Sequence, residues 1–217
     1  MKKRLIIFDL DGTLYSFDNS SSVNFTSSKF YDNIKRKVYV FLSKKLGIDG
    51  EKAKRLYEEI KKEFNGEVSL GLEDKLKIDR YEFFRKTWNL DPSQFIEQKD
   101  MLPLIKSLKG TPAFLTSAPR VWASRVLKYL NLNEYQDRLF TGEPNLRKPN
   151  PLVFKQICDS LGFSPLESIS VGDQVSTDII PAKSLGMKTI LVRSSSSEAD
   201  VCIESLAQIN EAVRRLK

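Results

Sequence analysis

Histidine is absent from this chain of 217 residues. No histidine can therefore act as a base, a nucleophile or a metal ligand, which excludes serine–histidine triads and zinc sites built on histidine. Any chemistry must be carried by carboxylates, hydroxyls, lysines, thiols or the backbone.

Cysteines and long apolar runs are scarce. Cys158 and Cys202 both lie among apolar residues, which indicates small core residues in a reducing compartment, the cytoplasm, and not a disulfide. No apolar run approaches the roughly 20 residues that a membrane span requires. The basic residues 2–4 precede only four apolar residues before Asp9, too few for a signal peptide. We therefore expect no membrane partner.

Basic residues outnumber acidic ones, 35 to 28, which gives a formal net charge of +7. They are scattered along amphipathic segments among many Glu and Asp, and no basic motif interleaved with aromatic residues is present. Most of this charge is expected on a solvated surface, so nucleic acid is not an expected partner. A basic protein favours anionic substrates through its long-range field, without selecting among them.

The first strand of the chain ends in two acids. Four consecutive apolar residues, 5–8, indicate a strand buried on both faces, as in a parallel sheet. Asp9 and Asp11 follow at its carboxyl end, where such sheets bind ligands, and Gly12 lets the backbone turn sharply. Two acids at this place are costly unless a cation or a reacting group lies between them. The alternative is a loop that happens to contain two capping aspartates.

Helical periodicity then dominates as far as about residue 90. Three helices are expected at residues 34–46, 53–64 and 73–88. Because no strand signal interrupts them, we expect a small all-helical cap domain over residues 16–98, inserted after the first strand. Residues 66–72 are expected to form the cap loop that reaches the substrate, unless their glycines serve only as helix stops.

Short strands and helices alternate from about residue 100. Strands are expected at residues 113–116, 139–141, 168–173 and 188–192. This alternation predicts an α/β fold with a doubly wound, largely parallel sheet, built from residues 1–15 and 99–217.

Polar side chains follow the ends of the expected core strands. They are Asp9, Asp11, Thr116, Ser117, Lys148, Asp173 and Asp178. If the strands lie side by side, these groups converge on one edge of the sheet. Carboxylates without His or Cys suit Mg²⁺, and a lysine with a hydroxyl suits a phosphoryl group. The set predicts phosphoryl transfer.

These segments resemble the haloacid dehalogenase-like (HAD) superfamily. Residues 9–13, DLDGT, resemble its first motif, Thr116 the second, Lys148 in KPNP the third, and GD at 172–173 with Asp178 the fourth. The motifs occur in order over nearly the whole chain, and the helical segment resembles the first-type cap of the superfamily. The resemblance implies a Rossmann-like core and a Mg²⁺-dependent phosphomonoester hydrolase with a small phosphorylated substrate.

The resemblance also implies roles for the residues that match. Asp9 would attack phosphorus and form an aspartyl-phosphate, and Asp11 would protonate the leaving alcohol and then deprotonate water. Thr116 and Lys148 would hold phosphoryl oxygens and oppose charge build-up. Ser117 departs from the asparagine often found after the second-motif threonine, so its phosphate contact is open. The alternatives are that Thr116 is merely a strand residue and that Lys148 is a surface lysine.

Magnesium, by the same resemblance, would bind the Asp9 carboxylate, the main-chain oxygen of Asp11, and Asp173. Asp178 would support this metal shell, or else simply cap the following helix.

Several activities compete within the superfamily. A dehalogenase lacks the acid corresponding to Asp11, and a P-type pump needs a membrane domain. Phosphosugar mutases typically use a cap histidine, which this chain does not have. A phosphomonoesterase remains, with nucleotide 5′-monophosphatase or phosphoglycolate phosphatase-like activity as alternatives and a non-catalytic phosphate-ligand sensor as another. The physiological ester and the oligomeric state stay open.

Overall fold

The computed structural model describes residues 4–19 and 25–216. Within these residues, six strands form one parallel sheet in the order β3-β2-β1-β4-β5-β6. The strands are β1 Arg4–Phe8, β2 Gly110–Leu115, β3 Leu139–Phe140, β4 Ser168–Gly172, β5 Lys188–Val192 and β6 Val201–Ile203. Phe8, the last residue of β1, pairs with Phe114 of β2 and Val171 of β4, so β1 ends between its two neighbours.

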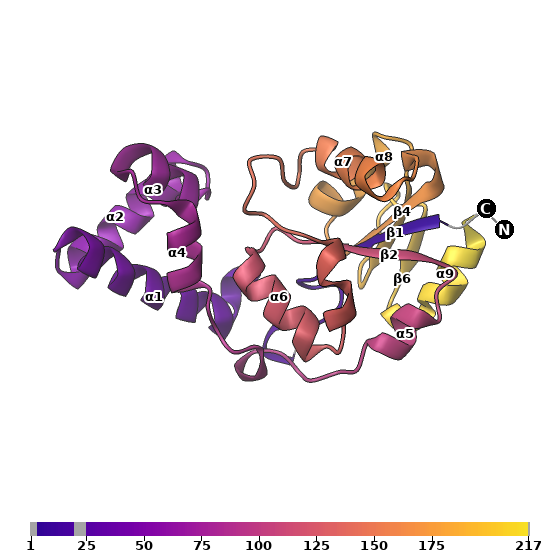
Figure 1. Ribbon diagram of the computed structural model, residues 1–217, viewed down its shortest axis with the longest axis horizontal. Coiled ribbons are helices and arrows are strands. Elements are labelled where there is room, and N and C mark those ends of the chain that lie inside the picture. The colour runs from indigo at the N-terminus through magenta and orange to yellow at the C-terminus, as the bar shows by residue number, and fades with distance from the viewer. Residues whose placement is uncertain (1–3, 20–24, 217) are drawn as a thin grey trace.

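Helices cover both faces of this sheet (Figure 1). They are α5 Leu102–Lys106, α6 Arg120–Tyr129, α7 Leu152–Leu161, α8 Ile180–Lys183 and α9 Ile209–Arg215. Ile6 and Phe8 belong to the hydrophobic cluster that includes α6 and α9, whereas Leu5 and Ile7 belong to the cluster that includes α7 and α8. Alternate residues of β1 thus pack against opposite layers, which requires residues 5–8 all to be apolar. The predicted doubly wound parallel sheet is confirmed.

Four helices form a separate group at the opposite end of the molecule from most of the sheet (Figure 1). They are α1 Lys29–Leu46, α2 Gly50–Glu63, α3 Val68–Leu76 and α4 Arg80–Thr87. Ser28 caps α1 by accepting a hydrogen bond from the Tyr31 amide, and Gly47 ends it with a left-handed φ of 66°. These helices are the predicted helical cap. Its boundaries at 15/16 and 98/99 stay a prediction, and residues 20–24 of the first connection lie outside the described residues.

The expected single helix over 73–88 is wrong. Lys77 adopts a left-handed φ of 53° and ends α3, and Asp79 begins α4 by accepting a hydrogen bond of 2.6 Å from the Glu82 amide. Apolar periodicity continues across this break because α3 and α4 pack on the same cap interior. The pattern alone therefore did not show the break.

The expected cap loop at 66–72 is wrong as well, because Val68 already begins α3. Gly71 is buried in that helix against α2 and its end. An added Cβ would lie 2.4 Å from Ile60 and 2.7 Å from Phe64. Gly71 therefore allows α2 and α3 to pack closely. Residues 66–72 do not line the cavity described below.

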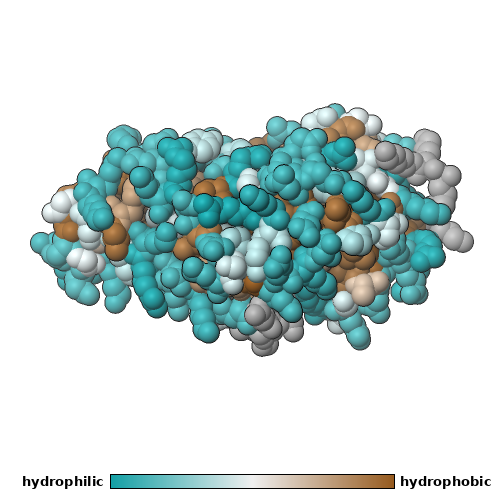
Figure 2. Space-filling model, turned by 60° about the horizontal axis from the view of Figure 1, so that its bottom comes forward, coloured by the Kyte–Doolittle hydropathy of each residue, from teal (hydrophilic) through white to brown (hydrophobic). Residues whose placement is uncertain are grey.

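A short strand at the sheet edge, β6, was not predicted, and it changes the placement of Cys202. This residue is exposed between buried Val201 and Ile203, so the expectation of a core cysteine is wrong for Cys202 and correct for buried Cys158. Both cysteines are free thiols. Among the described helices none is long and apolar enough to cross a membrane. On the face in Figure 2, hydrophilic residues separate small hydrophobic patches.

Candidate active site

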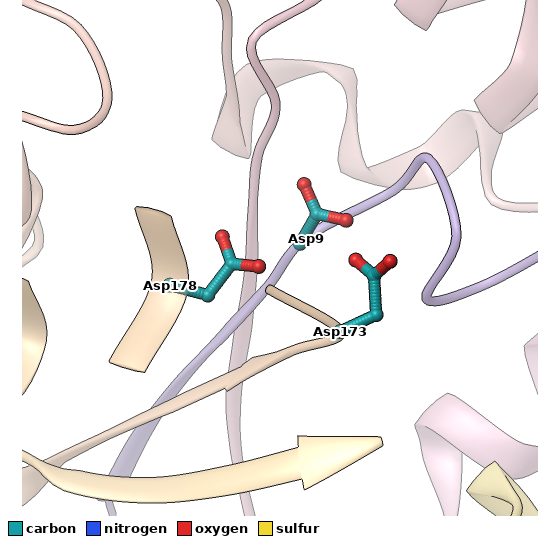
Figure 3. A group of neighbouring side chains, drawn as sticks. All are labelled: Asp9, Asp173 and Asp178. Carbon is teal, nitrogen blue, oxygen red and sulfur yellow. The ribbon is translucent and has the colours of Figure 1, made fainter. Parts of the chain in front are cut away.

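The carboxyl ends of the central strands bring the predicted acids together. Asp9 follows β1 directly, Asp173 follows β4, and Asp178 lies in a π-helix at Val175–Ile179. Carboxylate oxygens of these three residues all lie within 4.8 Å of one another. Figure 3 shows the three side chains gathered around a common space. Segments separated by more than 160 positions meet here because β1 and β4 are neighbours in the sheet.

This acidic cluster fits a divalent cation. Asp9 Oδ2 is buried and has no hydrogen-bond partner among the described residues. An uncompensated buried carboxylate oxygen is costly, and a metal ligand bond removes that cost. Three carboxylates and the single ammonium of Lys148 leave an excess of two negative charges if all are ionised. An oxygen-only donor set with this charge suits a hard cation.

Lys148 reaches the cluster from the loop after β3. Its ammonium donates hydrogen bonds to Asp9 Oδ1 at 2.6 Å and to Asp178 Oδ1 at 2.7 Å. The other Asp178 oxygen accepts a hydrogen bond of 3.0 Å from the Gln174 amide, so the carboxylate supports both Lys148 and the start of the π-helix. Burial lowers the pKa of Lys148, but the charges of Asp178 and Asp9 outweigh burial and raise that pKa above its usual value. Lys148 therefore remains an ammonium.

The carboxyl groups themselves are destabilised as anions. Burial raises the pKa of Asp9 well above its usual value, Lys148 opposes this, and the neighbouring acids reinforce it. Burial and the charge of Asp178 raise the pKa of Asp173 to about 6. Both shifts come from burial and from neighbouring negative charge, and a cation bound at these carboxylates would oppose them.

Two glycines make room for these carboxylates. Gly12 has a φ of 91°, and an added Cβ would lie 2.4 Å from Asp173 Oδ2. At Gly172 an added Cβ would lie 2.3 Å from the Asp178 carboxyl carbon. Neither position can hold a side chain while the acids keep their present places.

Asp11 is bonded to a different set of donors. Its Oδ2 accepts a hydrogen bond of 2.6 Å from the Thr116 hydroxyl, and its Oδ1 accepts one of 3.2 Å from Trp122 Nε1 and another from the Tyr15 hydroxyl. Thr116, in turn, accepts a hydrogen bond of 2.9 Å from the Ala118 amide. Thr116 is thus beside the acids, as expected, but its hydroxyl is bonded to Asp11 and does not line the cavity.

A cavity of about 460 Å³ opens over these groups. One side of its lining contains Asp9, Asp11, Ser117, Lys148, Asp173 and Arg193, and another contains the aromatic residues Phe17, Phe25 and Trp88. The predicted Ser117 is exposed in this cavity. Arg193 donates hydrogen bonds to the main-chain oxygens of Gly12 and Tyr15, which braces the turn after β1.

Two arginines tie the helical cap to the loop that carries Lys148. Arg80 of α4 is buried and donates to the Glu143 main-chain oxygen at 2.6 Å and to the Asn145 side chain. Arg147 forms an ion pair of 2.6 Å with Glu67, next to α3. Neither arginine was predicted, nor were Tyr15, Trp122 and Arg193. An isolated arginine or aromatic residue carries no spacing signal, and only the folded chain shows its partners.

Comparisons with known proteins agree with this arrangement. A family model described as haloacid dehalogenase-like hydrolase matches residues 3–186. A glyceraldehyde 3-phosphate phosphatase of Methanocaldococcus jannaschii is 27% identical over 232 positions, which cover 98% of this chain and 97% of that relative. A phosphoglycolate phosphatase of Neisseria meningitidis is 24% identical, with 98% and 94% covered. The crystal structure of a HAD phosphatase from Thermococcus onnurineus shares the fold, with a TM-score of 0.66, 24% identity and 97% of each chain covered.

Proposed function

This chain belongs to the haloacid dehalogenase-like hydrolase family, and we propose that it is a Mg²⁺-dependent phosphatase that hydrolyses a small phosphorylated metabolite. The observation that carries the proposal is the buried, unpartnered Oδ2 of Asp9 beside two further carboxylates and one ammonium. A nucleophilic carboxylate needs a free oxygen, and a phosphoryl group needs cations around it.

Asp9 is the proposed nucleophile. Its oxygen attacks phosphorus and forms an aspartyl-phosphate, while the bond from phosphorus to the alcohol oxygen breaks. Asp11 gives a proton to the departing oxygen and later takes one from the water that hydrolyses the intermediate. Both acids are carried by the turn after β1, which fixes their spacing.

The metal-binding residues are proposed to be Asp9, Asp173, the main-chain oxygen of Asp11, and Asp178 as support. The bound cation would neutralise charge on the phosphoryl oxygens and on the carboxylates. Magnesium is the proposed ion because the donors are oxygens alone. Asp178 has both oxygens bonded already, to Lys148 and Gln174, which favours a supporting role.

Lys148 and Ser117 are proposed to contact the phosphoryl oxygens from the cavity lining. Lys148 supplies a permanent positive charge at the point where negative charge builds up. The Thr116 hydroxyl would reach a phosphoryl oxygen only by turning away from Asp11, to which it is bonded at 2.6 Å.

The relatives support the proposed substrate class. Relatives that cover nearly the whole chain are named for glyceraldehyde 3-phosphate and phosphoglycolate, which supports a small phosphate monoester. A nucleotide 5′-monophosphate is the second candidate, because Phe17, Phe25 and Trp88 offer an aromatic wall to a leaving group. The two free thiols are consistent with the cytoplasm as the proposed compartment.

Phosphate release from p-nitrophenyl phosphate tests the proposal. We expect turnover with Mg²⁺, none with EDTA, and almost none in Asp9→Asn. The matched control is Asp159→Asn, which removes an exposed carboxylate paired with Lys155, and should keep full activity. Full turnover in Asp9→Asn, or in EDTA, would refute the proposed chemistry. A panel of triose phosphates, phosphoglycolate and nucleotides, compared by kcat/KM, then identifies the leaving group.

A further inference from the structure

Asp11 is surrounded by buried donors that take no part in the metal-binding cluster. Its Oδ1 accepts hydrogen bonds from the Tyr15 hydroxyl and from Trp122 Nε1, and the same Nε1 lies 3.1 Å from the Tyr15 oxygen. Tyr15 is 5% exposed, Trp122 is 0% and Thr116 is 1%, so all three donors lie on the buried side of Asp11. Hydrogen bonds to a charged group in such surroundings are strong and directional.

The two donors on Oδ1 are fixed in their roles. An indole N–H can only donate, and because that of Trp122 also faces the Tyr15 oxygen, the hydrogen of Tyr15 is directed at Asp11. Burial and the charge of Asp11 raise the pKa of Tyr15 well above its usual value, so the hydroxyl keeps its proton. Asp11 Oδ2, by contrast, is bonded to the Thr116 hydroxyl, which can either donate or accept.

We propose that Tyr15 and Trp122 are positioning residues that hold Oδ1 of Asp11 and leave Oδ2 to exchange protons with the reacting groups. This inference rests on the proposed function. In the first step the bond from phosphorus to the alcohol oxygen breaks, its electron pair stays on that oxygen, and the proton on Asp11 Oδ2 moves to it. In the second step a water oxygen bonds to phosphorus, the bond to Asp9 breaks, and a water proton returns to Oδ2.

The helical cap supports this arrangement through Trp122. The ring centroid of Phe30, in α1, lies 4.1 Å from that of Trp122. The ring centroid of Phe95 lies 5.3 Å from that of Phe30 and 6.4 Å from that of Trp122. The indole is therefore held between the core and the cap. A hydroxyl on Tyr15 and a nitrogen on Trp122 are polar groups in an otherwise aromatic cluster, and Asp11 is the acceptor that both share.

Leaving-group dependence tests the inference. Tyr15→Phe keeps the ring and removes the hydroxyl, and it is assayed with p-nitrophenyl phosphate and with phenyl phosphate, whose leaving group needs protonation far more. We expect kcat to fall roughly 10- to 100-fold for phenyl phosphate and less than about threefold for p-nitrophenyl phosphate, with KM little changed. Trp122→Phe should give the same pattern with a smaller loss. Tyr135→Phe, which removes the hydroxyl of a tyrosine that is not among the donors to Asp11, is the control and should match wild type.

An equal loss of kcat on both esters in Tyr15→Phe would show a merely structural role and would overturn the inference. A wild-type kcat on phenyl phosphate would also overturn it. If Tyr15→Phe does not fold, judged by thermal unfolding, Trp122→Phe decides by the same criterion. Asp11→Asn distinguishes a failure of the positioning role from a failure of the proposed function. Should Asp11→Asn lose phenyl phosphate turnover while Tyr15→Phe does not, the positioning role fails and the proposed function stands. Full activity in Asp9→Asn removes the proposed function itself.

Discussion

The ammonium of Lys148 lies 2.6 Å from Oδ1 of Asp9, although 139 positions separate the two residues in the chain. Both side chains are more than nine-tenths buried. The contact holds one oxygen of the carboxylate and leaves Oδ2 without a partner. A single lysine thus fixes the orientation of the proposed nucleophile and offsets part of the charge of the acidic cluster.

Removing the Lys148 ammonium should destabilise the protein and stop turnover. In Lys148→Met the buried carboxylates of Asp9 and Asp178 lose the ammonium that pairs with both, and breaking such a buried pair costs about 3 kcal/mol of unfolding free energy. Chemical denaturation without metal measures the loss. Lys155→Met, which breaks an exposed pair with Asp159, should cost less than about 0.5 kcal/mol. Comparable losses in the two variants would contradict this account of Lys148.

Gly12 should be required for metal binding more than for stability. In Gly12→Ala the new Cβ would displace Asp173, and we expect metal affinity to fall at least about tenfold. The positive φ adds about 1 kcal/mol of strain. Gly47→Ala has a positive φ but no atom within 4 Å of the new Cβ, so it should show strain alone. Titration of Mg²⁺ followed by thermal shift measures the metal affinity and the stability of both variants. Unchanged affinity in Gly12→Ala would mean that Asp173 is not a ligand.

Arg80 should hold the helical cap against the core. Arg80→Met keeps the apolar stem but removes the hydrogen bonds to Glu143 and Asn145, which should lower the unfolding free energy by about 2 kcal/mol and reduce kcat/KM. Small-angle scattering should show a more extended molecule. The control is Arg85→Met on the same helix, an exposed arginine 4.0 Å from Asp79. Identical scattering profiles for Arg80→Met and wild type would exclude this role.

Metal binding should weaken in acid. The pKa of Asp173 is raised to about 6, so below that pH a proton competes with the cation for the carboxylate. We expect the Mg²⁺ concentration at half-saturation to rise as the pH falls, by about tenfold per unit below pH 6 from protonation of Asp173 alone. For the metal-free protein, the contribution of Asp173 to folding stability changes with pH in the opposite direction. The folded state binds this proton more tightly than the unfolded chain, so the stability contributed by protonated Asp173 is present below pH 3.8 and lost as the pH rises through 6.

Thermal shift at a series of pH values, with and without Mg²⁺, checks the pH dependence of metal affinity and that of metal-free stability. Addition of Mg²⁺ should raise the melting temperature more at pH 7.5 than at pH 5. A melting-temperature gain independent of pH would mean that no carboxyl in the site titrates in this range.

Local pattern was sufficient for most elements of the core. Residues 5–8 are apolar throughout, so the buried strand β1 followed from chemistry that this segment carries itself. The break at Lys77 and the strand β6 did not follow. At Lys77 the apolar spacing continues through a left-handed residue, and β6 has only three residues at the sheet edge.

The core fold and the residue types of the site could be predicted because strand periodicity and the DLDGT segment are local features, and because parallel strands end at one edge of a sheet. The contacts within the site could not. They include the hydrogen bonds of Lys148 to Asp9 and Asp178, and those of Thr116, Tyr15 and Trp122 to Asp11. The Lys148–Asp9, Thr116–Asp11 and Trp122–Asp11 hydrogen bonds join residues more than a hundred positions apart in the chain. Such bonds depend on how helices and strands pack, and no spacing in the sequence encodes them.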